Sequence, residues 1–233
     1  MPVRLPTRKV DPASLAQHPL FADLTAEELA NLAGCLRRRW FAKGDVVYLA
    51  GDSSTTLYLV EVGRVKLVLT SPEGKELILE LAGPGELFGE TEVLDGQPRL
   101  SDAIVQQPCQ LLLLQRRDFL AFLEPRPRLA LRMLRLLSGR VRRHAQTVQD
   151  AVFQDVSARL ARAILDLADA PERAGSAYVV AAPPTQSELA GMIGATRESV
   201  NKWLGFYERH GVIRRHGREL CILRPDVLRQ RAS

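Results

Sequence analysis

The sequence predicts an α+β protein built from an antiparallel sandwich or barrel, one long helix and a small helical module at the C-terminus. Short apolar runs separated by turn signals fill residues 39–115, a pattern typical of antiparallel strands. A continuous helical pattern then covers residues 127–153. We therefore place the domain boundaries at 1–126, 127–154 and 155–233.

The composition is that of a globular protein without a membrane span. Hydrophobic residues make up 46% and charged residues 25% of the 233 positions. No apolar run approaches the ~18 residues of a membrane-spanning helix, and the N-terminal segment has no apolar core typical of a secretion signal. Cys35, Cys109 and Cys221 form no CxxC pair, which disfavours a zinc or iron–sulfur site. We expect a cytoplasmic protein with no metal and no membrane partner.

The first part is expected to begin with short helices over residues 14–36. Thr25 is an expected N-cap, and Glu28 completes a capping box. A further short helix is expected over residues 116–124. Turn signals such as Val62-Gly63 and Asp95-Gly96 separate the apolar runs between these helices. The expected strands cover residues 45–50, 56–62, 64–70, 75–82, 102–107 and 109–115.

The long helix has the apolar spacing of a coiled-coil seam. Its apolar positions repeat at alternating intervals of three and four residues, which is the pattern of two helices packed side by side. A helix of this length would extend for about 40 Å, and a second copy of the chain is the simplest cover for its apolar face. We expect a homodimer through residues 127–154; packing on its own barrel is the alternative. The expected seam residues are Leu134, Leu137, Val141, His144, Val148 and Ala151.

The C-terminal module has the signals of a winged helix-turn-helix. Asp155 caps an amphipathic helix, and a loop is expected at 171–177. Thr185 caps the next helix with a capping box to Glu188, and Gly194 ends that helix. Thr196 caps a second helix after a tight turn, the arrangement of a helix-turn-helix. Two short strands around residues 216–217 would form the wing.

This module is also where the positive charge gathers. From residue 185 onward the chain has nine Lys or Arg and five Asp or Glu, a net charge of +4 out of +5 for the whole chain. Arg197, Glu198 and Lys202 share one face of the second helix, and such side chains recognise base edges in the major groove of double-stranded DNA. An ordinary helical hairpin with a solvated face is the alternative. The expected phosphate contacts are Gln186, Thr196 and Ser199.

At this point the sequence resembles the cyclic-AMP receptor and fumarate–nitrate regulator (CRP/FNR) family of bacterial transcription regulators. The resemblance covers almost the whole chain, and its most specific segments are "GELFGE", "FQDVSARLARAILDLA" and "GATRESVNKWL". It implies an N-terminal β-roll of the cyclic-nucleotide-binding type, a dimerisation helix and a DNA-binding module. It further implies a two-fold operator with TGTGA-like half-sites. A loop at residues 170–176 matches the region that contacts RNA polymerase in activators.

The resemblance also implies an effector pocket in the roll, formed by Gly89, Glu90, Arg99, Ser101 and His144. In nucleotide-binding members the Glu takes the ribose hydroxyl, and an adjacent Arg-Ser or Arg-Thr pair takes the cyclic phosphate. Aligning Ser101 with the pocket hydroxyl puts Leu100 at the phosphate position. Arg99 would then point away, because a one-residue offset in an extended segment reverses the side chain. A turn of altered length at residues 95–98 is the alternative, and it would bring Arg99 back to the pocket.

The dimer helix departs from the nucleotide-binding members as well. The base-contacting Thr-Ser pair of those members falls at His144-Ala145, and alanine has no polar group. His144 is either an effector or pH-sensitive contact or a seam residue that fixes the register. Cyclic AMP is therefore a possible but disfavoured effector. A different small molecule, or activity without an effector, is the expectation.

Other classes of function were weighed against this one. A metal enzyme on the roll would need closely spaced histidines on strands, and the four histidines all lie outside the expected strands of the roll. A cyclic-nucleotide-binding subunit acting on another protein remains the alternative function. It would have no use for the base-contacting residues Arg197 and Glu198. We therefore expect a homodimeric, sequence-specific DNA-binding regulator that is not an enzyme.

Overall fold

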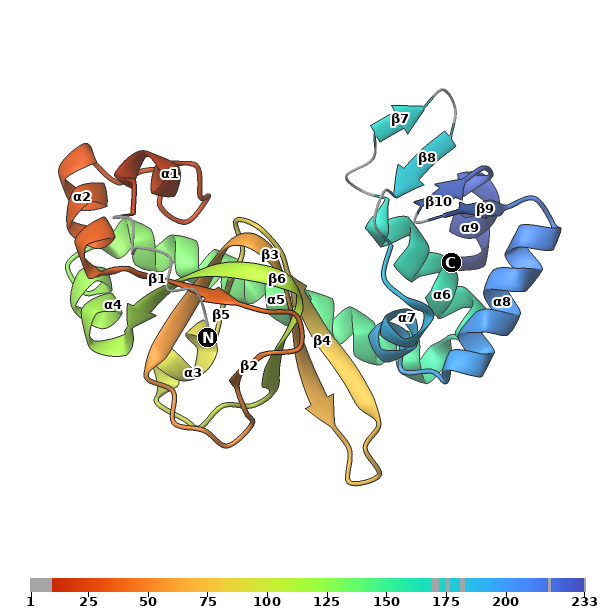
Figure 1. Cartoon of the computed structure of the whole chain (residues 1–233), viewed down its shortest axis with the longest axis horizontal. Coiled ribbons are helices and arrows are strands. Elements are labelled where there is room, and N and C mark those ends of the chain that lie inside the picture. The colour runs from red at the N-terminus through yellow and green to blue at the C-terminus, as the bar shows by residue number, and fades with distance from the viewer. Residues whose placement is uncertain (1–9, 169–171, 175–176, 181–182, 218, 233) are drawn as a thin grey trace. The chain divides into compact units, whose positions relative to one another are not determined.

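A computed structural model describes residues 10–168, 172–174, 177–180, 183–217 and 219–232, and its chain forms two compact units (Figure 1). The first unit comprises Met1–Ser71 and Leu79–Val141, and the second comprises Pro72–Ile78 and Arg142–Ser233. Within the described ranges, no helix is both long enough and apolar enough to cross a membrane.

The first unit is built on an antiparallel sheet in which the strands follow the order β1-β6-β3-β4. β2 pairs with β6, and β5 pairs with β3. Apolar side chains of the central strands, such as Val65, Val105 and Leu111, are buried inside the roll. The α+β class with an antiparallel N-terminal roll is confirmed. The strands are β1 (Arg37–Phe41), β2 (Val46–Tyr48), β3 (Thr56–Thr70), β4 (Glu76–Ala82), β5 (Leu87–Phe88) and β6 (Asp102–Gln115).

Two expected strand breaks are wrong. The Val62-Gly63 turn signal lies inside the continuous strand β3, and residues 102–107 and 109–115 form the single strand β6. Gly63 has a φ of 88° and lies where the register between β3 and β6 shifts. A Cβ at Gly63 would lie 2.2 Å from the carbonyl oxygen of Pro108. The glycine is therefore a bulge that accommodates the opposing Pro108, and both strands continue past it.

Helices pack against the roll and share a buried apolar cluster with its strands. The capping box at Thr25 is confirmed, since the Glu28 N–H donates to Thr25 Oγ1 (3.2 Å) and the Thr25 N–H donates to Glu28 (2.9 Å). The short α3 follows directly on β5 and was not expected. Leu15, Leu32 and Phe119 are among the buried side chains that these helices contribute. The helices are α1 (Pro12–Ala16), α2 (Ala26–Cys35), α3 (Glu90–Asp95), α4 (Arg116–Leu123) and α5 (Pro127–Phe153).

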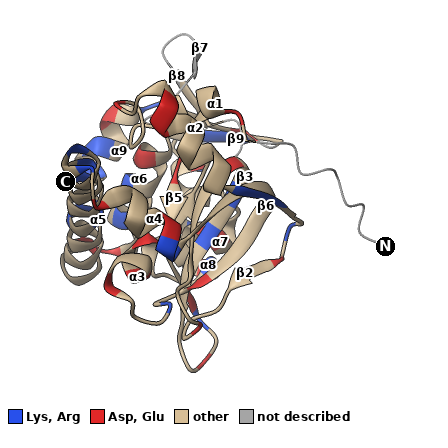
Figure 2. Cartoon of the chain, turned by 90° about the vertical axis from the view of Figure 1, so that its left-hand side faces the viewer, with Lys and Arg blue, Asp and Glu red and all other residues tan. Residues whose placement is uncertain are grey.

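The long helix α5 has the expected bounds and two different faces. Leu129 and Met133 are buried within the first unit. Val141 and Val148 are 67% and 63% exposed, so no described residue covers this part of the apolar seam. The helix also carries six arginines and one acidic residue, Asp150 (Figure 2).

The second unit packs helices on a small sheet of order β7-β8-β10-β9. The loop expected at 171–177 is wrong for residues 172–174, which pair with β8 as strand β7. The expected wing strands are confirmed as β9 and β10, and the C-terminal helix α9 was not expected. The elements are α6 (Val156–Leu167), β7 (Glu172–Ala174), β8 (Ala177–Val180), α7 (Gln186–Ile193), α8 (Arg197–Arg209), β9 (Ile213–His216), β10 (Glu219–Ile222) and α9 (Pro225–Ala232).

Candidate DNA interface and effector pocket

The turn between α7 and α8 follows from its sequence. The Glu188 N–H donates to Thr185 Oγ1 (3.3 Å), and the Thr185 N–H donates to Glu188 (2.7 Å), so the expected capping box begins α7. Gly194 ends the helix in the left-handed conformation, with a φ of 60°. Thr196 then caps α8 by accepting from the Ser199 N–H (3.2 Å). Two residues, Gly194 and Ala195, thus separate the helix from the next cap, as in a helix-turn-helix.

Helix α8 is fixed by apolar contacts and by one buried polar network. Val200 and Leu204 lie in the core of the unit. The Tyr207 hydroxyl donates to the carbonyl of Ser157 (2.9 Å) and contacts the Ser157 hydroxyl (2.9 Å) at the start of α6. Arg231 of α9 donates to the same Ser157 hydroxyl (2.9 Å). Buried hydrogen bonds of this kind fix the orientation of a helix as well as stabilise it. They hold α8 so that its outer face points away from α6 and α9.

That outer face carries the residues expected to contact bases. Arg197, Glu198 and Lys202 are all exposed. Neither Arg197 nor Lys202 forms an ion pair with a residue that the structure describes. The pKa of the Glu198 carboxyl is lowered, mainly by a hydrogen bond from the backbone N–H of Glu198. A hydrogen bond from Thr196 and the charge of Arg197 lower it further. The face therefore presents two cations and one carboxylate at neutral pH, the donor and acceptor set that base edges require.

The three residues expected at phosphates lie beside this face, close to the N-termini of α7 and α8. Gln186 donates to Asn201 of α8 (3.1 Å), and Thr196 donates to Ser199 (3.1 Å). These hydrogen bonds join the two helices and complete the α8 cap. The role of the three side chains at phosphates stays a prediction.

In the first unit, the pocket segment is a tight turn from β5 into α3. Gly89 is the N-cap of α3, with a φ of 76°. A Cβ there would lie 2.5 Å from Nη1 of Arg99. Glycine is thus required for two reasons, the left-handed backbone and the close approach of a guanidinium. Glu90 is the first residue of α3 and is 0% exposed.

The expected direction of Arg99 is wrong. Arg99 is only 4% exposed and points into the roll, while Leu100 is 64% exposed and points outward. Ser101 is buried, so Arg99 and Ser101 share the inner face and Leu100 has the outer one. Two backbone hydrogen bonds hold residue 99 against the turn at Gly51 and Asp52, and burial alternates along the three side chains that follow from this point. Leu100, which the expected alignment put at the phosphate position, is therefore the one of the three side chains that points outward.

Arg99 is surrounded by acceptors and by an aromatic ring. Its Nη1 donates to the carbonyl of Gly89 (2.8 Å) and to Glu92 (3.3 Å), and its Nη2 donates to the carbonyl of Thr56. Its guanidinium carbon lies 4.2 Å from the centre of the Tyr48 ring, a cation–π contact. Burial raises the pKa of the Tyr48 hydroxyl, so that ring stays neutral.

Arg140 of α5 is a pocket residue that the sequence analysis missed. Its Nη1 forms an ion pair with Glu90, and its Nη2 donates to the carbonyl of Leu87 and pairs with Glu80 (3.2 Å). One sequence signal could have identified Arg140. It follows Leu129, Met133 and Leu136 at helical spacing, so it lies on the face of α5 whose other residues are apolar and expected to be buried. A buried arginine requires a buried acidic partner.

The pocket residues still have polar capacity for a ligand. Oε2 of Glu90, Nε of Arg99 and Nε of Arg140 are buried without a hydrogen-bond partner among the described residues. One acceptor and two guanidiniums fit a sugar hydroxyl and an anionic group such as a phosphate. His144 is exposed on the part of α5 that belongs to the second unit. The structure therefore brings together Gly89, Glu90 and Arg99, and it adds Arg140. Ser101 is buried on the same side of its segment as Arg99.

Comparison with known proteins agrees with this arrangement. Residues 38–126 match the cyclic nucleotide-binding domain family, and residues 158–231 match the Crp-like helix-turn-helix domain family. A CRP-like cAMP-activated global transcriptional regulator of Mycobacterium tuberculosis is 32% identical over 219 residues, covering 94% of this chain and 98% of the relative. The chain belongs to the CRP/FNR family. It is a DNA-binding transcription regulator, a class whose members are not enzymes.

Other members of the CRP/FNR family are similar over nearly the same length. The cyclic AMP receptor protein of Thermus thermophilus is 34% identical over 196 residues, covering 84% of this regulator and 88% of the relative. The crystal structure of the Thermus thermophilus catabolite activator protein is 32% identical, covers 92% of this regulator and 98% of that chain, and has a TM-score of 0.53. The c-di-GMP responsive regulator CLP of Xanthomonas campestris shares the fold, with a TM-score of 0.73 and 23% identity over 85% of this regulator and 99% of that chain.

Proposed function

We propose that this regulator is a homodimer that binds a two-fold operator with TGTGA-like half-sites and responds to a cyclic nucleotide. The observation that carries the proposal is the exposed face of α8 with Arg197, Glu198 and Lys202, where neither cation has an ion-pair partner among the described residues. Two functions compete with this one. The first is DNA binding without an effector, and the second is a cyclic-nucleotide-binding protein that regulates another protein.

The base contacts follow from the chemistry of that face. Arg197 is the first residue of α8, and the first turn of a recognition helix is where base contacts concentrate. Its planar guanidinium can donate two hydrogen bonds to guanine, and the Glu198 carboxylate can accept from the amino group of cytosine. Lys202 lies one turn further along the same face. In a TGTGA half-site one strand offers guanines and the complementary strand offers the cytosines paired with them.

The exposed seam of α5 supports the dimer. Leu134, Val141 and Val148 repeat at intervals of seven residues and are each more than half exposed. An exposed apolar row of this kind is typical of a surface that contacts another protein. Two copies packed along α5 would cover it symmetrically, and a two-fold protein requires a two-fold operator.

A cyclic nucleotide is the effector that suits the pocket, because the inward direction of Arg99 removes the main objection to it. Arg99 would hold the cyclic phosphate, and Glu90 would accept from a ribose hydroxyl through its unpartnered Oε2. The M. tuberculosis and T. thermophilus relatives are named for cyclic AMP. The pairs Glu90–Arg140 and Arg99–Glu92 would have to rearrange in part to admit the ligand.

The operator proposal is tested by competition between two duplexes, one with a TGTGA palindrome and one with the same bases scrambled. Binding is measured with and without cyclic AMP at several salt concentrations. We expect the palindrome to bind at least ~1000-fold more tightly, as is typical of specific over non-specific binding. Equal and equally salt-sensitive affinity for both duplexes would refute specific recognition.

The dimer and the effector each have a separate test. Val141→Glu combined with Val148→Glu should give monomers in analytical ultracentrifugation. Gln149→Glu should leave the dimer intact, because Gln149 is exposed and lies about 100° around the helix axis from Val148 and still farther from His144. Calorimetry with cyclic AMP should show binding that Arg99→Gln weakens at least ~10-fold. Arg117→Gln is the matched control, since Arg117 lies exposed on α4. Absence of cyclic AMP binding to the unaltered protein would favour an effector-free regulator.

A contact with RNA polymerase through residues 170–176 stays a proposal. Most of that loop lies outside the described residues, and its residues 172–174 form β7. Substitution of the loop should reduce transcription activation in vitro while leaving operator binding unchanged.

A further inference from the structure

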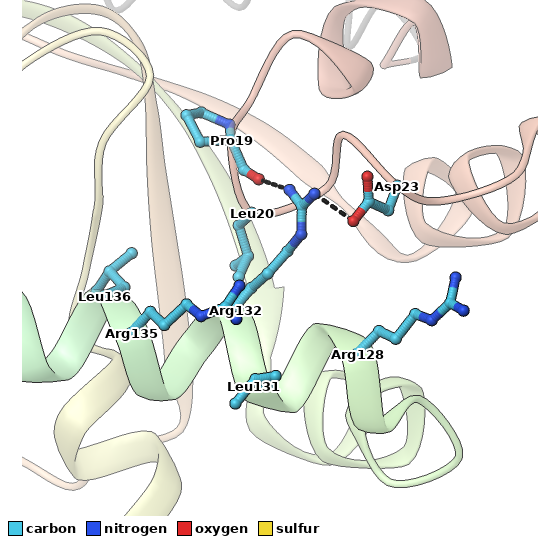
Figure 3. A pocket seen from close by; sticks show the side chains of 8 residues that line it. All are labelled: Pro19, Leu20, Asp23, Arg128, Leu131, Arg132, Arg135 and Leu136. Carbon is cyan, nitrogen blue, oxygen red and sulfur yellow. Dashed lines mark hydrogen bonds and ion pairs between the residues drawn. The ribbon is translucent and has the colours of Figure 1, made fainter.

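A cavity of about 630 Å³ lies against the first turns of α5, formed by residues other than those of the effector pocket (Figure 3). One wall is the segment between α1 and α2, with Pro19, Leu20 and Asp23, and the other is α5 from Arg128 to Leu136. This volume falls within the ~300–1,000 Å³ of ordinary small-molecule sites.

The cavity is strongly positive. Arg128, Arg132 and Arg135 line it together with a single carboxylate, that of Asp23. Arg132 uses that carboxylate, since one of its nitrogens pairs with Asp23 and another donates to the carbonyl of Pro19 (Figure 3). Arg128 and Arg135 are exposed and form no ion pair with a described residue. Two guanidiniums at one small cavity are thus left without a counter-charge.

The rest of the lining is apolar. Leu20 is buried in the core of the unit, Leu136 packs partly against the same core, and Leu131 is half exposed at the cavity. A lining that joins apolar side chains to unneutralised guanidiniums suits a ligand with both an apolar part and an anionic group. Inorganic anions alone would leave the leucines uncovered, and a neutral apolar molecule would leave the charges unpaired.

The cavity lies off the proposed dimer seam. At about 100° per residue, Arg128, Arg132 and Arg135 are displaced by roughly 120°, 160° and 100° around the helix axis from Leu134. A second copy packed on the seam would therefore meet a different face of α5. The cavity stays open to a ligand in the homodimer.

We propose that this cavity binds an amphipathic organic anion, a molecule with an aliphatic chain or ring that ends in a carboxylate or a phosphate ester. Arg128 and Arg135 pair with the anionic group, and Leu20, Leu131 and Leu136 contact the apolar part. Arg132, tied to Asp23 and Pro19, holds the two walls at a fixed separation. The site is a second ligand site on the sensor unit.

The proposal is tested by calorimetry on the full-length protein with four probes: decanoate, decyl phosphate, decanol and inorganic phosphate. We expect decanoate or decyl phosphate to bind, and the stronger of the two identifies the anionic group. Arg128→Gln combined with Arg135→Gln should weaken that binding at least ~10-fold, the loss expected for charge-assisted hydrogen bonds. Both arginines are exposed and unpaired, so the protein should remain folded.

The control is Arg117→Gln, which removes one exposed arginine of the same unit outside the cavity and should leave binding unchanged. Methyl signals of Leu131 and Leu136 in nuclear magnetic resonance spectra should shift on titration. The proposal is refuted if neither amphipathic anion binds, if decanol binds as tightly as decanoate, or if the double variant binds as well as the control. Cyclic AMP binding should be the same in the double variant, which separates this site from the effector pocket.

Discussion

Glu90 and Arg140 form an ion pair inside the roll, and that pair joins the first residue of α3 to the long helix α5. Glu90 is fully buried, and Arg140 is nearly so. The residue expected to contact the effector is therefore coupled directly to the helix expected to form the dimer. An effector that competes for Glu90 would change the contacts of α5 without any intermediate element.

The first prediction concerns this pair. Arg140→Met should lower the free energy of unfolding by about 3–5 kcal/mol, because it leaves the Glu90 carboxylate buried without a partner. The double variant Glu90→Gln with Arg140→Met should be more stable than Arg140→Met alone. Urea unfolding in a Trp203→Phe background, followed by the fluorescence of Trp40 in β1, reports on the first unit. A double variant no more stable than the single one would show that the pair is not coupled.

The second prediction concerns Gly89. Gly89→Ala and Gly85→Ala both place a side chain on a left-handed backbone, with φ of 76° and 80°, at a cost of ~1–2 kcal/mol each. Only Gly89→Ala also displaces Arg99, since no atom lies within 4 Å of a Cβ at Gly85. Gly89→Ala should therefore be less stable than Gly85→Ala by about 1 kcal/mol or more, and it should bind cyclic AMP more weakly. Equal stability and equal binding of the two variants would contradict the close approach of Arg99.

A third prediction concerns base recognition. Arg197→Ala should weaken operator binding by about 1–3 kcal/mol and relax the preference at one base pair of each half-site. Arg209→Ala is the control, because Arg209 lies exposed in the last turn of the same helix. Binding is measured against a set of duplexes with single substitutions in the half-site. If base preference survives in Arg197→Ala, Arg197 has no role in base recognition.

The fourth prediction concerns His18. Burial lowers the pKa of His18 to about 4, and a hydrogen bond with the backbone of Gly85 opposes this only in part. In the unfolded chain the imidazole takes up its proton near pH 6.5. Between these two pKa values the unfolded state binds more protons than the folded state. The free energy of unfolding therefore falls as the pH drops from 7 to 4, by at most about 3 kcal/mol.

The His18 effect is measured by urea unfolding of the first unit at a series of pH values, again followed by Trp40. In the native protein the Leu20 N–H donates to Nδ1 of His18 (3.1 Å). His18→Asn removes the titrating group and still supplies an acceptor for this N–H. We expect a flatter pH dependence in this variant and no change in His216→Asn, which alters the exposed wing. An unchanged slope in His18→Asn would assign the acid sensitivity to other groups.

The sequence by itself determined the features that depend on local contacts. The caps at Thr25, Asp155 and Thr185 use a side chain and a backbone group three residues apart, so their residues are visible as short motifs. The bounds of α5 and the tight turn at Gly194 also follow from neighbours in sequence. The exposed face of α8 with Arg197 and Lys202 was predicted because helical spacing alone places these two side chains together.

Only the tertiary structure decided the features that join distant segments. Gly63 continues β3 instead of ending it because Pro108, on a strand paired with it, requires a bulge there. Arg99 turns inward because the backbone at Gly51 and Asp52 pairs with residue 99 and sets the alternation of side chains. Arg140 enters the pocket because α5 packs on a roll whose acidic residues lie 50 or more positions earlier in the chain. The physical reason is the same in each case: the free energy of these contacts depends on long-range pairing, which no local pattern specifies.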